Sequence, residues 1–225
     1  VEDMPNLKTY QNVKLFGSYD FDEDGVKSQD LLLINNGYLK TLLSDRIPTK
    51  KIFVSNGHRR GGAINYSNLK ITALKNKQKN EKELKAEMLK LCKKRNLPYG
   101  IIVKKITNKN VFNASIYRLA HDLFNYNMRK TILPLEVYKL YPDGREELLR
   151  DVEIGGMFAQ TFKEILQVGN KHYVYNFIAA PANWNSDNTN VSIISPDLFF
   201  EDCELRIVEK DNKKLPILKN PLYKK

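Results

Sequence analysis

The feature that most constrains the fold of this chain is an Asn-Gly pair between two short apolar runs. The runs are Leu31–Ile34 and Tyr38–Leu43, and Asn36 with Gly37 lies between them. Asparagine and glycine tolerate the positive φ of a tight two-residue turn, so this arrangement is a strong signal for a β-hairpin. The sequence therefore predicts a hairpin over residues 30–44.

A second hairpin is expected in the second half of the chain. Residues 135–141 alternate apolar and polar side chains, and the Pro142–Gly144 turn leads back into the run 147–150. Further strands are expected at 101–103, 172–178, 190–194 and 203–209. The strand at 101–103 is predicted to be buried because it consists of three consecutive apolar residues.

Two helices are predicted between these groups of strands. Asn80 and Glu83 have the spacing of a capping box, and helical periodicity continues from there until about Asn96. The apolar face of this helix consists of Leu84, Met88, Leu91 and Cys92. A second, shorter helix is predicted over 157–168, with Gly169 as its stop.

Hairpins dominate this pattern, and the helices interrupt groups of strands instead of alternating with single strands. The pattern favours an α+β fold, a mostly antiparallel β-sheet built from hairpins with two or three inserted helices. With 225 residues, of which 42% are hydrophobic, the chain can bury a sizeable core. We predict one domain over 1–209, in which 111–131 is a loop with helical content, and a basic exposed tail over 210–225.

The chain is basic, with 37 Lys and Arg against 26 Asp and Glu and a net charge of +11. Such a charge attracts nucleic acid or an acidic surface. No base-reading helix or stacking motif accompanies it, so we expect nucleic-acid binding to be weak, and a basic nucleic-acid-binding module remains the alternative function. No apolar run reaches the roughly 18 residues of a membrane span. We expect a cytoplasmic protein, with export left open if a signal was removed.

The residues themselves do not indicate a catalytic centre. The histidines His58, His121 and His172 lie far apart in the sequence, and no H-E-x-x-H helix is present. A G-x-S-x-G nucleophile elbow and a phosphate-binding loop are also missing. Cys92 and Cys203 belong to no C-x-x-C motif, and we expect both to be buried thiols. The residues alone therefore predict an α+β domain without an active site of its own.

One loop is richer in binding chemistry than a simple connection requires. It contains Ser55, Asn56, Gly57, His58, Arg59 and Arg60, followed by two glycines. Backbone amides at glycines and guanidinium groups suit a carboxylate or the end of a peptide. We predict that this loop lines a substrate cleft, with Arg59 or Arg60 as the carboxylate contact, and that replacing both arginines leaves stability nearly unchanged. A solvated loop with an arginine pair is the alternative.

These stretches, in this order, resemble the TldD/PmbA family of modulators of DNA gyrase. The matching segments are Tyr19–Gly25, Leu33–Lys40, Ser55–Arg60, Pro134–Tyr138, Tyr141–Arg145 and Val191–Leu198. Each piece alone is weak, but their order and spacing together are specific, and they cover most of residues 19–205. The resemblance implies the C-terminal domain of a metallopeptidase-related protein.

The resemblance also implies a zinc site whose ligands this chain lacks. Peptidase members of the family bind zinc through an H-E-x-x-x-H helix, which lies upstream of every matched segment, and through a cysteine that follows Asn-Gly. Here Asn176 is followed by Phe177–Pro181 without a cysteine. Cys203 falls in the closing strand, where alternation predicts a packing residue. We expect no catalytic residue, no metal ligand and no cofactor in this chain, although zinc is expected in catalytic members.

Family members assemble as dimers, so the resemblance implies a homo- or hetero-oligomer with another TldD/PmbA-type chain. We expect the chain to contribute to assembly and to a substrate cleft, with a peptide as the substrate. A pure dimerisation scaffold for a catalytic partner remains open beside this interpretation.

Overall fold

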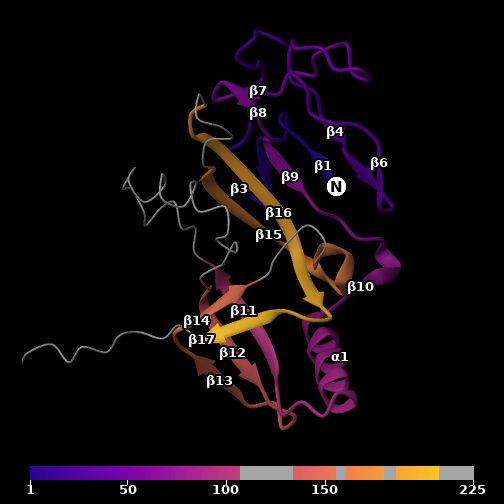
Figure 1. Ribbon diagram of the computed structural model, residues 1–225, viewed down its shortest axis with the longest axis vertical. Helices are drawn as coiled ribbons and strands as arrows, with labels where there is room; N and C mark the ends of the chain where they lie inside the picture. The colour runs from indigo at the N-terminus through magenta and orange to yellow at the C-terminus, as the bar shows by residue number, and fades with distance from the viewer. Residues whose placement is uncertain (107–133, 156–160, 180–185, 208–225) are drawn as a thin grey trace, which may run out of the picture.

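The computed structural model describes residues 1–106, 134–155, 161–179 and 186–207. In Figure 1 the N-terminal strands form the upper part of the molecule, and the α-helix with a small sheet forms the lower part. Two long strands, β15 (Ile165–Ala179) and β16 (Thr189–Phe200), run side by side between these parts (Figure 1).

The largest sheet has six strands in the order β10-β15-β16-β9-β1-β4. Its shorter members are β1 (Glu2–Asp3), β4 (Leu31–Leu32), β9 (Asn68–Lys70) and β10 (Gln78–Lys79). The β15–β16 pair is antiparallel over a register that ends at Ala179 opposite Thr189. β9 and β10 join this pair in parallel, one on each side. The sheet therefore brings the N-terminal segment and the beginning of β16 together.

Smaller antiparallel sheets surround it. The lower part contains β11 (Gly100–Ile106), β12 (Pro134–Leu140) and β13 (Glu146–Leu149), and β14 (Val152–Gly155) paired with β17 (Glu204–Ile207). Three hairpins lie in the upper part, namely β2 (Thr9–Tyr10) with β3 (Val13–Lys14), β5 (Ile34–Asn35) with β6 (Tyr38–Leu39), and β7 (Arg59–Arg60) with β8 (Ala63–Ile64).

This architecture confirms the predicted α+β class, since antiparallel pairing dominates the described strands. Both predicted hairpins are present. Asn36 and Gly37 form the first turn with φ of 50° and 81°, as a two-residue turn requires. The helix α1 (Glu81–Lys94) begins with the predicted capping box between Asn80 and Glu83.

The second predicted helix is wrong. Residues 165–168 already belong to β15, and Gly169 lies within this strand instead of stopping a helix. Only the short 3₁₀ turn η2 (Thr161–Glu164) is helical in the described part of this segment. The apolar spacing there fits a short helix as well as a strand, and cross-strand pairing with β16 decides between them.

Four further expectations need correction or lie outside the described residues. The strand at 101–103 is half-buried, not buried. Cys203 is exposed and lies before β17, so it is not a packing residue, whereas Cys92 is buried as expected. The segment 111–131 with His121, and the tail 210–225, lie outside the described residues. The single domain over 1–209 stays a prediction.

The two parts of the molecule have different interiors. In the lower part, Met88 and Cys92 of α1 pack with Leu140 of β12 in an apolar cluster. The upper part buries polar side chains alongside apolar ones such as Leu15 and Val191. Asp3, His58, Ser67, Asn68 and Ser192 are all fully inaccessible to solvent. Buried polar groups need hydrogen-bond partners, so this interior is a network that fixes the surrounding loops.

Candidate functional site

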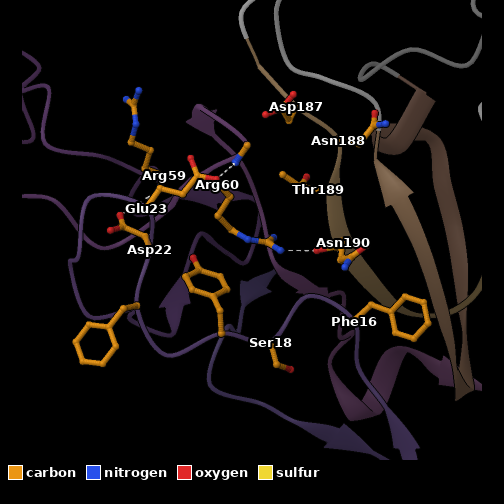
Figure 2. A pocket seen from close by; sticks show the side chains of 13 residues that line it. Phe16, Ser18, Asp22, Glu23, Arg59, Arg60, Asp187, Asn188, Thr189 and Asn190 are labelled. Carbon is orange, nitrogen blue, oxygen red and sulfur yellow. Dashed lines mark hydrogen bonds between the residues drawn. The ribbon is translucent and has the colours of Figure 1, made fainter.

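A polar cavity of about 420 Å³ lies in the upper part, between the β7–β8 hairpin and the start of β16 (Figure 2). We call Asp22, Glu23, Arg59, Arg60 and Gly61 the hairpin wall, and Asp187, Asn188, Thr189 and Asn190 the strand wall. Tyr19, Ser18, Phe16 and Phe21 complete the lining.

Gly61 allows the two walls to meet. Its carbonyl accepts a hydrogen bond from the amide of Asp187 at 2.7 Å. Its φ is +60°, and a Cβ at this position would lie only 2.6 Å from the carbonyl oxygen of Asp187. A residue with a side chain would therefore be strained and would also push the strand wall away.

Backbone amides occupy both carboxylates of the hairpin wall. Glu23 accepts hydrogen bonds from the amides of Gly61 and Gly62 at 2.5 and 2.7 Å. Asp22 accepts the amides of Asp24, Val26 and Arg59. These two side chains thus hold the loop 22–26 against the β7–β8 hairpin, and their lone pairs are largely used inside the protein.

The two arginines of this wall are also engaged. Arg59 pairs with Asp45 at 3.1 Å and with Asp24 at 3.6 Å. Arg60 donates to the carbonyl oxygens of Tyr66 and Asn190 at 2.7 and 2.5 Å. Burial lowers the pKa of the Arg60 guanidinium, but an arginine stays charged in proteins.

Tyr19 lies beneath Arg60, whose guanidinium carbon is 4.8 Å from the centre of the tyrosine ring. The Tyr19 hydroxyl donates to the carbonyl of Gly57 at 2.7 Å. Burial raises the pKa of Tyr19 well above its ordinary value, so the phenol keeps its proton and this hydrogen bond. The ring therefore positions Arg60 without taking part in proton transfer.

Behind the hairpin wall lies a buried pair formed by Asp3 and His58. The Asp3 carboxylate accepts the amide of Ser67 at 2.9 Å and its hydroxyl at 2.8 Å. Nε2 of His58 lies 3.1 Å from the other carboxylate oxygen, close enough for an ion pair but poorly aligned for a hydrogen bond. Both side chains are completely buried.

The neighbours of His58 hold its ring in place. Nδ1 lies 2.8 Å from Oδ1 of Asn56 and 3.0 Å from the backbone oxygen of the same residue. Oδ1 also accepts the amide of Ser44, and Nδ2 donates to Leu42, so the amide orientation of Asn56 is fixed. Both imidazole nitrogens therefore face oxygen atoms, which enclose the ring on two sides.

The strand wall differs, because three of its side chains have unused polar groups. Asp187 and Asn188 are exposed, and within the described part of the chain their side chains make no hydrogen bond or ion pair. Thr189 is only 6% exposed, yet its hydroxyl has no partner there either. Buried hydroxyls nearly always have a partner, so Thr189 requires an explanation.

The predicted site loop is only partly at the cavity. Arg59 and Arg60 line it, whereas Asn56, Gly57 and His58 are buried and Ser55 accepts a hydrogen bond from Gly57. The alternative of a solvated loop is therefore wrong for Asn56, Gly57 and His58, which contacts with Asp3 and Glu23 hold in or against the interior. Its role in binding a substrate stays a prediction.

Sequence reasoning missed the strand wall and Asp3. The run Asp187–Asn190 is polar and precedes a strand, a weak signal that many ordinary loops share. Asp3 gave no signal, since its partners are more than 50 positions away in the sequence.

Among the described residues, no set of side chains fits a zinc site. No group of three His, Cys, Asp or Glu side chains converges in the described residues. His58 is fully buried, and oxygen atoms already face both of its ring nitrogens. A catalytic zinc needs three protein ligands and an open position for water.

Comparison with protein families matches residues 1–125 to the PmbA/TldA metallopeptidase C-terminal domain. This match covers more than half of the 225 residues. The chain belongs to this family. The resemblance described from the motifs is thereby confirmed, and both the SNGHRR loop at 55–60 and the hairpin at 30–44 lie within the matched PmbA/TldA segment. Comparison with curated proteins gives no match.

A solved structure supports the PmbA/TldA fold over most of the chain. A protein from Thermotoga maritima, described as a candidate modulator of a DNA gyrase, superposes with a TM-score of 0.58 at 19% sequence identity. The match covers 91% of this chain but only 38% of the length of that protein. Among the described residues, no helix has the length and apolar character needed to cross a membrane.

Proposed function

We propose that this chain is a non-catalytic PmbA/TldA-type domain that associates with a second PmbA/TldA-type chain and contributes part of a peptide cleft. The observation that carries the proposal is a series of exposed apolar side chains in one stretch of the upper part. They are Leu32, Ile34, Tyr38, Leu39, Leu42, Ile47, Phe53 and Val54.

Single exposed apolar residues are ordinary, but a concentration of large ones marks an interaction surface. Phe53 and Val54 are 76% and 77% exposed, and Tyr38 is 74% exposed. The stretch belongs to the part of the chain that matches the PmbA/TldA domain. The similar Thermotoga protein has more than half of its length outside the matched region. A chain segment or second chain that corresponds to that remainder would need an apolar surface like this one to pack against.

The test of assembly is light scattering on the purified chain, where a second copy is the simplest partner. We expect a dimer that dissociates at least about tenfold more readily when Leu39 and Phe53 are both replaced by glutamate, because charges at an apolar interface lose their hydration. Ile207→Glu is the matched control, since Ile207 is 79% exposed but lies outside this stretch. A strict monomer at all concentrations would contradict the proposal.

The absence of a metal site is part of the same proposal. Its support is the lack of converging ligands in the described residues and the enclosure of His58 by Asn56 and Asp3. Elemental analysis after incubation with zinc should give far less than one zinc per chain, and a peptidase assay should remain at background. One tightly held zinc per chain that is lost in a His58→Ala variant would overturn this part.

The peptide cleft is carried by a separate observation, the Thr189 hydroxyl at the 420 Å³ cavity. Cavities of a few hundred Å³ with a small number of unused polar groups are typical binding sites. Binding of short peptides to the chain, measured by calorimetry, tests this part independently of assembly.

A further inference from the structure

We propose that the strand wall binds a primary ammonium group of a peptide, either its free N-terminus or a lysine side chain, through Asp187 and Thr189. This inference rests on the proposed peptide cleft and names the group that the cleft recognises. It replaces the carboxylate ligand that the arginine pair of the sequence indicates.

Acidic side chains outnumber basic ones around the cavity. Three carboxylates (Asp22, Glu23 and Asp187) and two guanidiniums (Arg59 and Arg60) line it. Arg59 has two further carboxylate partners, Asp24 and Asp45, just outside the lining. The local charge is therefore negative even though the whole chain is basic, so a cation is favoured in this cavity.

The charged side chains at the cavity differ in how many bonds they already make within the chain. The carboxylates of the hairpin wall hold backbone amides, and the arginines hold Asp45 and two carbonyl oxygens. Asp187 is exposed, and its carboxylate makes no bond within the described residues. A carboxylate ligand on Arg59 or Arg60 would share a guanidinium that already has partners within the chain, whereas an ammonium on Asp187 would replace only water.

Thr189 of the strand wall also has an unused polar group. It is more than nine-tenths buried and lines the cavity, and its hydroxyl oxygen lacks a partner among the described residues. A buried hydroxyl without a partner is unfavourable, and a ligand that donates a hydrogen bond to it removes this cost. The hydroxyl oxygen is itself covered, so a ligand reaches this acceptor only by displacing the surrounding cavity lining, and no group of the described chain uses it.

The strand wall has acceptors for the donors of an ammonium group. An –NH₃⁺ has three donors and no acceptor. Asp187 and Thr189 both line the cavity and lie on the same side of the chain, whereas the Asn188 side chain points away from them (Figure 2). Phe16 and Phe21 also line the cavity and are 52% and 63% exposed, so they can cover the apolar part of the bound residue.

The experiment measures peptide binding to the full chain by calorimetry. Four synthetic hexapeptides are used. The first has no lysine, a free N-terminus and an amidated C-terminus, and the second is its N-acetylated form. The third is an acetylated form with one lysine, and the fourth is an acetylated, lysine-free form with a free C-terminal carboxylate. We expect at least one of the two ammonium peptides, the first or the third, to bind at least about tenfold more tightly than the N-acetylated, amidated peptide. The first peptide against the third tells the N-terminus from lysine.

Variants assign the binding to the strand wall. Asp187→Asn and Thr189→Val should each weaken binding about tenfold, and Thr189→Ser should restore most of the loss because it keeps the hydroxyl. Asp143→Asn is the charge-matched control, since Asp143 is exposed and lies in the β12–β13 turn. Thermal melts check that each variant is folded.

The outcomes separate this inference from the cleft proposal. Tightest binding of the carboxylate peptide, with Asp187→Asn unchanged, would overturn the ammonium inference and leave the peptide cleft in place. Equal binding of all four peptides would do the same. No binding of any peptide would overturn both.

Discussion

The two walls of the cavity lie within hydrogen-bond distance of each other but differ in how their polar groups are used. In the hairpin wall, Glu23 and Arg60 direct their charged groups to backbone atoms of the same chain. In the strand wall, Asp187 and Thr189 have groups without such partners in the described residues. Proximity to a cavity therefore does not identify a binding residue, and the state of its hydrogen-bonding groups is the better guide.

This difference predicts that the walls respond differently to substitution. Residues of the hairpin wall and the network behind it should affect folding, because their removal leaves buried groups unpaired. Residues of the strand wall should affect binding with little effect on folding, because their removal breaks no internal bond.

The largest effect is expected from Asp3→Ala. It removes the only carboxylate beside the buried His58 among the described residues and leaves the Ser67 amide without its acceptor. We expect a loss of about 3–5 kcal/mol in the free energy of unfolding, measured with urea, because the buried amide and hydroxyl of Ser67 both lose a carboxylate acceptor. The control Asp20→Ala removes an exposed pair with Lys8 and should cost about 0–1 kcal/mol. A loss below that of the control would show that the buried pair does not stabilise the hairpin wall.

Arg60→Met should have the next largest effect. Methionine keeps much of the side-chain stem but loses the hydrogen bonds to Tyr66 and Asn190 and the contact with Tyr19. We expect a loss of about 2–3 kcal/mol in unfolding free energy. Arg59→Met should cost less, about 1 kcal/mol, because its ion pairs are partly exposed. Unchanged stability in Arg60→Met would instead support the alternative that the loop is solvated.

Gly61→Ala tests the contact between the walls. The positive φ should cost about 1 kcal/mol, and the close approach of the new Cβ to the Asp187 carbonyl should raise the total to about 2–3 kcal/mol. Gly37→Ala is the matched control, because Gly37 has φ +81° but no atom within 4 Å of the added Cβ. Equal losses in the two variants, measured by urea unfolding, would mean that the walls can separate at no extra cost.

The smallest effect on stability is expected in the strand wall. Asp187→Asn and Thr189→Val should each change the free energy of unfolding by no more than about 0.5 kcal/mol. Thr189→Val could be slightly stabilising, since it removes a buried hydroxyl without a partner among the described residues. A loss of 2 kcal/mol or more, again from urea unfolding, would reveal a structural role and remove the contrast between the walls.

Local signals in the sequence predicted much of the fold. Asn36-Gly37 and the Asn80–Glu83 capping box act within a few residues, so the turn and the start of α1 could be predicted directly. The prediction of a helix over 157–168 was wrong because the conformation of residues 165–168 depends on pairing with β16, more than 20 residues away. Local periodicity cannot contain that information.

The candidate site was harder to predict for the same reason. The loop 55–62 was identified by its chemistry, but its burial depends on Asp3 and Glu23 from the N-terminal segment. The strand wall could not be predicted from the sequence, because only the folded structure places Asp187 beside Gly61. A sequence shows which groups are charged, but not which charges are already satisfied by distant backbone atoms.

The most direct test of the central claim is a nuclear magnetic resonance titration of the full chain with a hexapeptide that carries the preferred ammonium group. The account predicts that the largest amide shifts fall on Gly61 and on Asp187–Asn190, with little change at Tyr38, Leu39 and Phe53 in the proposed assembly surface. Shifts concentrated at the assembly surface, with Asp187–Asn190 unchanged, would contradict the assignment of the strand wall as the binding side of the cavity.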